Sequence, residues 1–290
     1  MSVSALSLYT FLFAILILIP FLVRERRRGG PAKAAMEGKS RASGAASYVL
    51  LGVLGLLPPS ILMSWGIEHS SGSNAAILTL TIPILMLAIA VPMLGERFTW
   101  VRIGALLLAL VGAIFISGND VAGGSFTQST LIGNLVIFAA CAGSAFYNIY
   151  SRKLLQMHSE LEVLIYGYAV AAVLCALCSW YLDPSPFYRV ANVPASAWIA
   201  VAVLGSLTWG VSMVLFMWLL TRLDIALISV SIYFLSFFGV LLSAVTLGER
   251  VHLMQIVGAI VVIIAAVISD SYERRLANSA KAQAASNAAP

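Results

Sequence analysis

Two sets of uncharged polar residues are the best candidates for chemistry in this chain. Ser229, Tyr233 and Ser236 recur at intervals of four and three residues within an apolar stretch, and Ser144 and Asn148 lie four residues apart in an earlier one. This spacing places each set on one face of a helix. Polar groups on an inward face either bond across helices or line a wet cavity. A single residue of this kind is more often an interhelical contact, whereas two stripes favour a cavity.

The apolar stretches also contain backbone breaks at corresponding places. Pro58-Pro59 interrupt one stretch, and 153 residues after Leu57 stands Gly210, beside Trp209 in the middle of a later stretch. Matching breaks in related segments mark binding sites near the middle of a membrane. Trp209 is too far from either end of its stretch to be a headgroup anchor. We therefore expect Trp209 to stack on a bound solute or to wall it in.

Pro83 is a further break. It lacks the amide that would bond the carbonyl of Thr79, so we expect a free acceptor there. The alternative is an ordinary kink, because neighbouring helices can satisfy freed backbone groups. The position corresponding to Pro83 in the later stretch is Ser236. The residues expected to line the cavity are Thr79, Pro83, Ser144, Asn148, Trp209, Ser212, Ser229, Tyr233 and Ser236.

Groups suited to acid–base catalysis or metal binding are not gathered in this sequence. No Asp, Glu, Lys or His stands near the middle of an expected span, where a charge costs about 3 kcal/mol and marks an ion relay. His69, His158 and His252 are scattered, and the 3 cysteines fall inside apolar stretches. We therefore expect no catalytic residue, no cofactor and no metal site, and hence no enzyme.

The composition predicts a membrane protein. Hydrophobic residues make up 61% of the chain and charged residues 10%, with a mean hydropathy of +0.97. A soluble globule of this length would need more polar surface. The net charge of +5 comes from basic residues in the connectors between apolar stretches, where anionic lipid headgroups are the natural partner. The lipid bilayer is therefore an expected partner, and nucleic acid is not.

The hydropathy pattern predicts an all-α polytopic protein. The nine expected spans cover residues 5–23, 47–67, 74–93, 98–117, 131–150, 161–182, 196–220, 225–246 and 251–269, each long enough to cross about 30 Å of hydrocarbon. Arginines follow the first span, which argues against a cleaved signal peptide. They place residues 24–46 in the cytoplasm and the N-terminus outside. Alternation then puts 15 of the 17 Lys and Arg inside, as expected for cytoplasmic connectors.

A repeated turn predicts two related halves. Leu94-Gly95-Glu96-Arg97 follows the third span, and Leu247-Gly248-Glu249-Arg250 follows the eighth, 153 residues later. Five spans separate the two turns, so the second copy would face the opposite side of the membrane, as in inverted-repeat transporters. The turns themselves have a structural explanation: each glycine suits a helix C-cap, and each glutamate meets the positive end of the next helix dipole.

The segments around these turns resemble the EamA-type domain of the drug/metabolite transporter superfamily. The features that carry the resemblance are Pro83, the turn at residues 94–97, Thr99-Trp100, the stretch from Gly104 to Gly112, the segment 225–269 and the segment 145–154. The resemblance implies ten helices in two inverted halves, a central substrate cavity and alternating access without ATP. This chain departs from that pattern, because no residues match the first helix of the first half, which leaves four spans plus five.

The expected organisation is therefore a first EamA-like repeat at residues 1–117 without its first helix, a linker at 118–130, a second repeat at 131–270 and a disordered cytoplasmic tail at 271–290. With no fixed charge in the spans, we expect a secondary transporter of a small neutral or zwitterionic metabolite, such as an amino acid, in the inner membrane. The alternatives are a non-transporting partner subunit and an integral-membrane enzyme. The expected partner is a small-molecule substrate, with a homodimer as an open alternative to a monomer.

Overall fold

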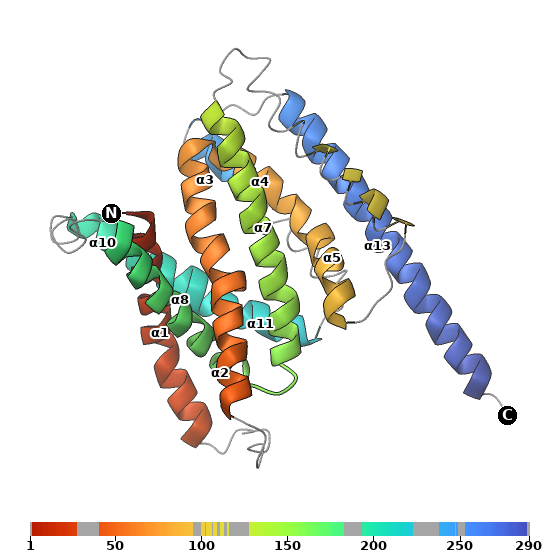
Figure 1. The fold of residues 1–290 in the computed structure, drawn as a ribbon, viewed down its shortest axis with the longest axis horizontal. Helices are drawn as coiled ribbons and strands as arrows, with labels where there is room; N and C mark the ends of the chain where they lie inside the picture. The colour runs from red at the N-terminus through yellow and green to blue at the C-terminus, as the bar shows by residue number, and fades with distance from the viewer. Residues whose placement is uncertain are drawn as a thin grey trace. The chain divides into compact units, whose positions relative to one another are not determined.

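The structure is a computed structural model, and its described residues are helical apart from short connections (Figure 1). They comprise residues 2–27, 41–94, 100–101, 103–105, 107–108, 111–112, 115, 128–182, 193–222, 238–246, 248 and 253–288. No strand occurs among them. The expected all-α class is therefore confirmed.

The chain divides into two compact units. Unit 1 contains Met1–Trp65 and Gly143–Ile228, and unit 2 contains Gly66–Ala142 and Ser229–Pro290. Each unit thus draws on both halves of the sequence. The long helix α7, Gln128–Leu154, contributes its first part to unit 2 and its last part to unit 1.

Unit 1 is built on α1 (Val3–Arg27) and α8 (Glu160–Leu182), which pack along each other. The second span begins with α2 (Arg41–Leu50) and continues through two π-helical segments, η1 (Leu51–Leu56) and η2 (Pro58–Leu62), into α3 (Met63–His69). Unit 1 includes this span as far as Trp65. Its last span runs through α10 (Ala195–Val203), the π-helical η4 (Leu204–Ser212) and α11 (Met213–Arg222). Helix α1 contacts η4, and α8 contacts η1.

Unit 2 contains α4 (Gly72–Leu78), the 3-10 turn η3 (Thr79–Thr81), α5 (Ile82–Leu94) and α13 (Leu253–Ala288). A chain of side-chain hydrogen bonds connects α13 and α4, through Ser70, to the first part of α7. Gln255 Nε2 donates to Asn74 Oδ1 at 2.6 Å, and Asn74 Nδ2 donates to Ser70 Oγ at 3.0 Å. Ser70 Oγ donates in turn to Asn134 Oδ1 at 2.5 Å. These amides therefore act as contacts between helices.

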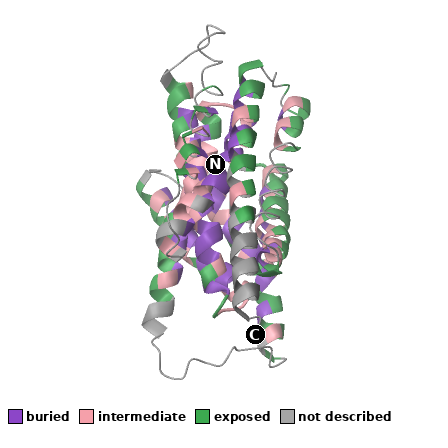
Figure 2. Ribbon diagram, turned by 90° about the vertical axis from the view of Figure 1, so that its right-hand side faces the viewer, coloured by how far each residue is buried: buried purple, intermediate pink, exposed green. Residues whose placement is uncertain are grey.

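Among the described residues, six helical stretches are long and apolar enough to cross a membrane. They are Val3–Glu25, Ala45–His69, Gly72–Ala90, Ser129–Leu154, Glu160–Tyr181 and Ala195–Arg222, and they coincide with the first, second, third, fifth, sixth and seventh expected spans. Apolar side chains such as Leu16, Ile199 and Val245 are exposed on these and neighbouring helices, and Figure 2 shows exposed positions on many of the helices. Lipid would cover them in a bilayer. The protein is therefore a multi-pass membrane protein, while the count of nine spans stays a prediction.

Helix α13 extends to Ala288. Its last part is rich in alanine and carries Arg274, Arg275 and Lys281, and these residue types have high helix propensity. The disordered cytoplasmic tail expected at residues 271–290 stays a prediction.

In the second copy of the repeated turn, the structure describes Gly248. Gly248 has a φ of +66°, the left-handed conformation that favours glycine at the end of a helix. This confirms the expected role of Gly248. Gly95, Glu96 and Arg97 of the first copy lie outside the described residues.

Candidate functional site

The π-helical segments of unit 1 begin at equivalent positions of the two sequence halves. Segment η1 starts at Leu51 and η4 starts at Leu204, 153 residues later, which is the spacing between the two Leu-Gly-Glu-Arg turns. A π-helix leaves the regular hydrogen-bond ladder of an α-helix, and such segments are frequent at functional sites. The expected pair of backbone breaks is therefore present, in the form of wider helix turns.

A glycine near the start of η1 and of η4 allows a close approach of helices. A Cβ at Gly205 would lie 2.5 Å from the carbonyl oxygen of Thr10 on α1, and a Cβ at Gly52 would lie 2.5 Å from Val170 Cγ1 on α8. Gly52 and Gly205 also differ by 153 residues. Segments η1 and η4 are thus packed in the same manner, each against a helix of the other sequence half.

Side-chain hydroxyls bond backbone carbonyls in both breaks. Tyr168 Oη on α8 donates to the carbonyl of Trp209 in η4 at 2.8 Å. Ser7 Oγ on α1 donates to the carbonyl of Ser60 in η2 at 3.3 Å, and Ser64 Oγ donates to the same carbonyl at 2.9 Å. An unbonded carbonyl in hydrocarbon costs several kcal/mol, so these contacts stabilise the irregular backbone.

Trp209 belongs to an aromatic cluster with Phe11 of α1 and Tyr168 of α8. The rings of Phe11 and Trp209 meet edge to face with centroids 5.0 Å apart, and those of Tyr168 and Trp209 do so at 5.9 Å. Phe11 and Tyr168 stack at 5.3 Å. Both of these partners are fully buried, whereas Trp209 is partly exposed. Trp209 is therefore held in place on one side and remains accessible on another.

Two buried hydroxyls on α7 lack a partner. Tyr147 Oη and Ser151 Oγ make no hydrogen bond in the part of the chain that the structure describes, and the two residues are exposed by only 3% and 0%. Tyr147 also packs against Gly55 of η1, whose added Cβ would lie 3.1 Å from the Tyr147 Cβ. Buried polar groups without partners are rare in native proteins and mark places where water or a ligand binds.

The expected site residues are divided between the two units. Ser144 and Asn148 on α7 and Trp209 and Ser212 on η4 belong to unit 1, with Asn148 buried and Ser212 exposed. Thr79 and Pro83 belong to unit 2. Ser229, Tyr233 and Ser236 lie outside the described residues, so that stripe stays a prediction.

The expected free carbonyl at Thr79 is absent. The 3-10 turn η3 brings the amide of Ile82 to this carbonyl, and the Thr79 hydroxyl bonds the carbonyl of Ala76 at 2.6 Å. The prediction was wrong because it assumed a regular α-helix before Pro83. In a 3-10 turn a carbonyl accepts from the amide three residues later. The amide of Ile82 therefore takes the place of the amide that Pro83 lacks.

Sequence reasoning missed Phe11, Tyr147 and Tyr168. Tyr168 stands in the middle of an apolar span, and a buried tyrosine hydroxyl usually has a polar partner, so this residue carried a usable signal. Tyr147 was noticed only as part of a motif. Phe11 gave no signal, because one phenylalanine among many apolar residues indicates nothing about its neighbours.

The chemistry available in this cluster is uncharged. Aromatic faces and hydroxyls can contact an apolar side chain or accept and donate hydrogen bonds. Within the described residues, no three His, Cys, Asp or Glu lie close enough together to hold a metal ion. The arrangement therefore suits binding of a small solute.

Comparison with known proteins agrees with these features. A Streptantibioticus cattleyicolor protein named "Probable terminal-alkyne amino-acid exporter" is 27% identical over 220 residues, which cover 76% of this chain and 71% of that protein. "Uncharacterized transporter YyaM" of Bacillus subtilis is 25% identical over 227 residues, covering 76% and 71%. One solved crystal structure shares the fold with a TM-score of 0.63 at 20% identity, covering 95% of this chain and 90% of that one.

A family model gives the assignment. The model of the EamA-like transporter family matches residues 1–118 and again residues 131–269, which together make up most of the chain. The relatives above are named as transporters or exporters and not as enzymes. The chain therefore belongs to the EamA-like transporter family.

Proposed function

We propose that the protein is a secondary transporter that moves a small neutral or zwitterionic metabolite, of the amino-acid class, across the inner membrane by alternating access. The observation that carries the proposal is the aromatic cluster of Phe11, Tyr168 and Trp209 at a π-helical break. The same unit holds the buried hydroxyls of Tyr147 and Ser151, for which the described part of the chain shows no hydrogen bond. The relative named as an amino-acid exporter supports the substrate class.

The uncharged character of this cluster favours a solute without net charge. The charged residues of the described spans stand in their terminal turns, for example Glu25, Arg152 and Arg222. A net charge at the middle of the bilayer would then have no counter-ion, which is costly. The ring of Trp209 would cover the apolar part of the solute, and hydroxyls would replace its hydration.

The π-helical segments suit a transporter that changes shape. A π-helical turn has poorer packing than an α-helical turn and is a common site of local adjustment. Two such turns, η1 and η4, stand in equivalent spans of the two sequence halves. Interconversion between wider and narrower turns would let each span bend while its ends keep their positions. We place the N-terminus outside and the C-terminus in the cytoplasm, on the distribution of Lys and Arg.

Uptake into proteoliposomes tests this function. Purified protein would be reconstituted and assayed by counterflow with a panel of radiolabelled neutral L-amino acids, including L-norvaline and the terminal-alkyne amino acid L-propargylglycine. We expect saturable flux, and we expect Trp209→Ala to raise KM about tenfold, because a well-packed aromatic contact contributes on the order of 1 kcal/mol or more.

Trp218→Ala is the matched control. Trp218 lies on α11, the helix that follows η4 in the same span, and is 45% exposed. The Cζ atom of Arg222 lies 4.5 Å from the centroid of its ring. Removal of the Trp218 ring should leave KM unchanged. A complete lack of flux for every solute in the unsubstituted protein would reject transport and support the partner-subunit alternative. Equal effects of the two substitutions would reject the site while leaving transport intact.

A further inference from the structure

A cavity in unit 1 has a different chemical character from the aromatic cluster. It has a volume of about 540 Å³ and lies at the end of the unit where α1 and α11 end and α7 connects to α8. Small-molecule sites have volumes of roughly 300 to 1,000 Å³. The cavity is thus large enough for a metabolite.

The walls of this cavity carry charges of both signs. Glu25 comes from the end of α1, Arg152 from the last turn of α7 and Glu160 from the start of α8. All three side chains are partly buried, so salt screens them less than fully exposed charges. The guanidinium of Arg152 can bind a carboxylate through two hydrogen bonds. The carboxylates can bind an ammonium group.

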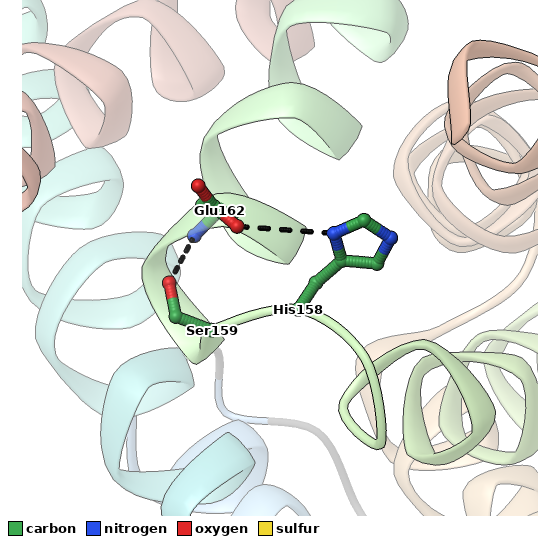
Figure 3. Close-up of polar contacts among 3 residues, drawn as sticks. All are labelled: His158, Ser159 and Glu162. Atoms are coloured by element: carbon green, nitrogen blue, oxygen red, sulfur yellow. Dashed lines mark hydrogen bonds and ion pairs between the residues drawn. The ribbon is translucent and has the colours of Figure 1, made fainter. Parts of the chain in front are cut away.

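The first turn of α8 shows which of its two glutamates belongs to the cavity. Glu160 lines the cavity, whereas the carboxylate of Glu162 is turned to His158, with 3.8 Å between Oε2 and Nδ1 (Figure 3). The backbone amide of Glu162 bonds Ser159 Oγ at 3.3 Å, which caps the helix. Glu160 and Glu162 thus lie in the same helix turn and are both carboxylates, but Glu160 lines the cavity and Glu162 contacts His158.

The lining of the cavity offers charges of both signs to a ligand, with Arg152 on α7 and Glu160 on α8. A zwitterion with a carboxylate and an ammonium group a few ångströms apart finds an opposite charge for each.

Helix α8 carries residues of both the cavity and the aromatic cluster, and α7 carries both Arg152 and Tyr147. Tyr168 follows Glu160 by eight residues on α8, which is about 12 Å along the helix axis, and Tyr147 precedes Arg152 by five residues on α7, about 8 Å. A solute bound by its charged ends at the cavity would therefore be within two or three helix turns of the cluster. The basic residues at these helix ends place the cavity on the expected cytoplasmic side.

We propose that this cavity is an entrance subsite that recognises the α-carboxylate of an amino-acid zwitterion through Arg152 and its ammonium group through Glu160. This inference rests on the proposed function and adds to it a second place where the substrate binds. The aromatic cluster then selects by side chain, and the entrance subsite selects by the zwitterionic ends.

Competition in the counterflow assay tests the carboxylate arm. L-Norvaline would be the labelled solute, and unlabelled L-norvaline and L-norvaline methyl ester, which lacks the carboxylate, would be the competitors. We expect Arg152→Gln to raise KM about tenfold with kcat within about twofold, since one charge-assisted pair is lost from binding. The same substitution should abolish the preference for L-norvaline over its methyl ester.

Lys153→Gln is the matched control for that arm. Lys153 is the next residue of the same helix end, carries the same charge, is exposed and does not line the cavity. Its KM and competitor preference should stay at the unsubstituted values. A KM and competitor preference in Arg152→Gln equal to those of Lys153→Gln would overturn the carboxylate assignment.

The ammonium arm is tested in the same way with N-acetyl-L-norvaline, which lacks the ammonium group. We expect Glu160→Gln to raise KM several-fold and to reduce the preference for L-norvaline over its N-acetyl derivative, whereas Glu162→Gln should do neither. Melting temperatures in detergent would establish that each variant folds, with Arg152→Lys as a milder substitute that keeps the charge but loses the bidentate geometry.

The outcomes separate this inference from the function on which it rests. Flux of L-norvaline with unchanged kinetics and unchanged competitor preference in both Arg152→Gln and Glu160→Gln would overturn the entrance subsite and leave the transporter standing. Absence of flux and of ligand-induced melting shifts in the unsubstituted protein, for every neutral amino acid tried, would overturn the transport function and the subsite together.

Discussion

Single hydroxyl groups have contrasting environments in unit 1. The hydroxyl of Tyr168 has a backbone carbonyl as its partner, at 2.8 Å, whereas the hydroxyl of Tyr147 has no partner among the described residues. Both side chains are buried. In an apolar surrounding, a bonded hydroxyl contributes to stability and an unbonded one costs free energy. The second is retained in spite of that cost, which suits a group that meets a solute.

Removing each hydroxyl should therefore have opposite effects. Tyr168→Phe leaves the Trp209 carbonyl without its donor, and we expect it to lower the free energy of unfolding by about 0.5 to 1.5 kcal/mol. Tyr147→Phe should leave stability unchanged or slightly raise it, while weakening uptake. Thermal unfolding in detergent measures the first effect, and the counterflow assay measures the second. Equal losses of stability in the two variants would contradict this account.

The sequence allowed part of this site to be predicted. Trp209 stood out because an indole in the middle of a span has no headgroup to anchor it, and the structure places it in the aromatic cluster. Thr79 was misjudged, because a 3-10 turn and an α-helix before a proline differ only in backbone bonding. Phe11 could not be found at all, since its role depends on which helix packs against α1, and nothing in the spacing of apolar residues gives that neighbour.

At the scale of elements, the two π-helical segments are the feature that both halves share. Their position was predictable from the offset of 153 residues together with Pro58 and Pro59. Their form was not, because η4 contains no proline and its widening depends on contact with α1. Gly52 and Gly205 are the sequence trace of these contacts, since only a residue without Cβ permits such an approach.

Adding one methyl group should disturb these contacts. Gly205→Ala directs a Cβ to within 2.5 Å of the Thr10 carbonyl oxygen, which is fixed backbone, so we expect a loss of about 1 to 3 kcal/mol in the free energy of unfolding. Gly52→Ala meets the side chain of Val170 and should have a smaller effect. Thermal unfolding of the purified variants in detergent would measure both.

Gly104→Ala provides the comparison for this series. No atom of the described residues lies within 4 Å of an added Cβ at Gly104, and alanine exceeds glycine in helix propensity by about 1 kcal/mol. This variant should therefore be as stable as the unsubstituted protein or more stable. A Gly205→Ala protein that melts at or above the temperature of Gly104→Ala would refute the close packing of η4 on α1.

For the whole molecule, composition and hydropathy were enough to predict an all-α membrane protein, and six expected spans are present as helices. The grouping of these helices was not predictable, because the sequence repeat suggests two consecutive halves, whereas each compact unit contains segments from both. Packing depends on which faces are complementary, and apolar membrane helices differ little in hydrophobicity from face to face. The order of the helices along the sequence therefore does not predict which helices pack together.

The opposite orientation of the two halves yields the last prediction. If five spans separate the two Leu-Gly-Glu-Arg turns, a cysteine at Glu96 and a cysteine at Glu249 must face opposite sides of the membrane. In a background in which the partly exposed Cys178 is replaced by serine, a membrane-impermeant maleimide applied to intact cells should label Glu249→Cys. Glu96→Cys should be labelled only after the membrane is opened.

Two residues of known exposure calibrate that experiment. Glu68 and Lys153 are exposed, and each stands in the last turn of a span. The distribution of basic residues along the sequence predicts Glu68 outside and Lys153 inside. Glu68→Cys should thus behave as Glu249→Cys, and Lys153→Cys as Glu96→Cys. Because inverted polarity requires an odd number of crossings between the two turns, labelling of positions 96 and 249 from the same side would mean an even number. The two halves would then be parallel, and a site related by inversion would have no geometric basis.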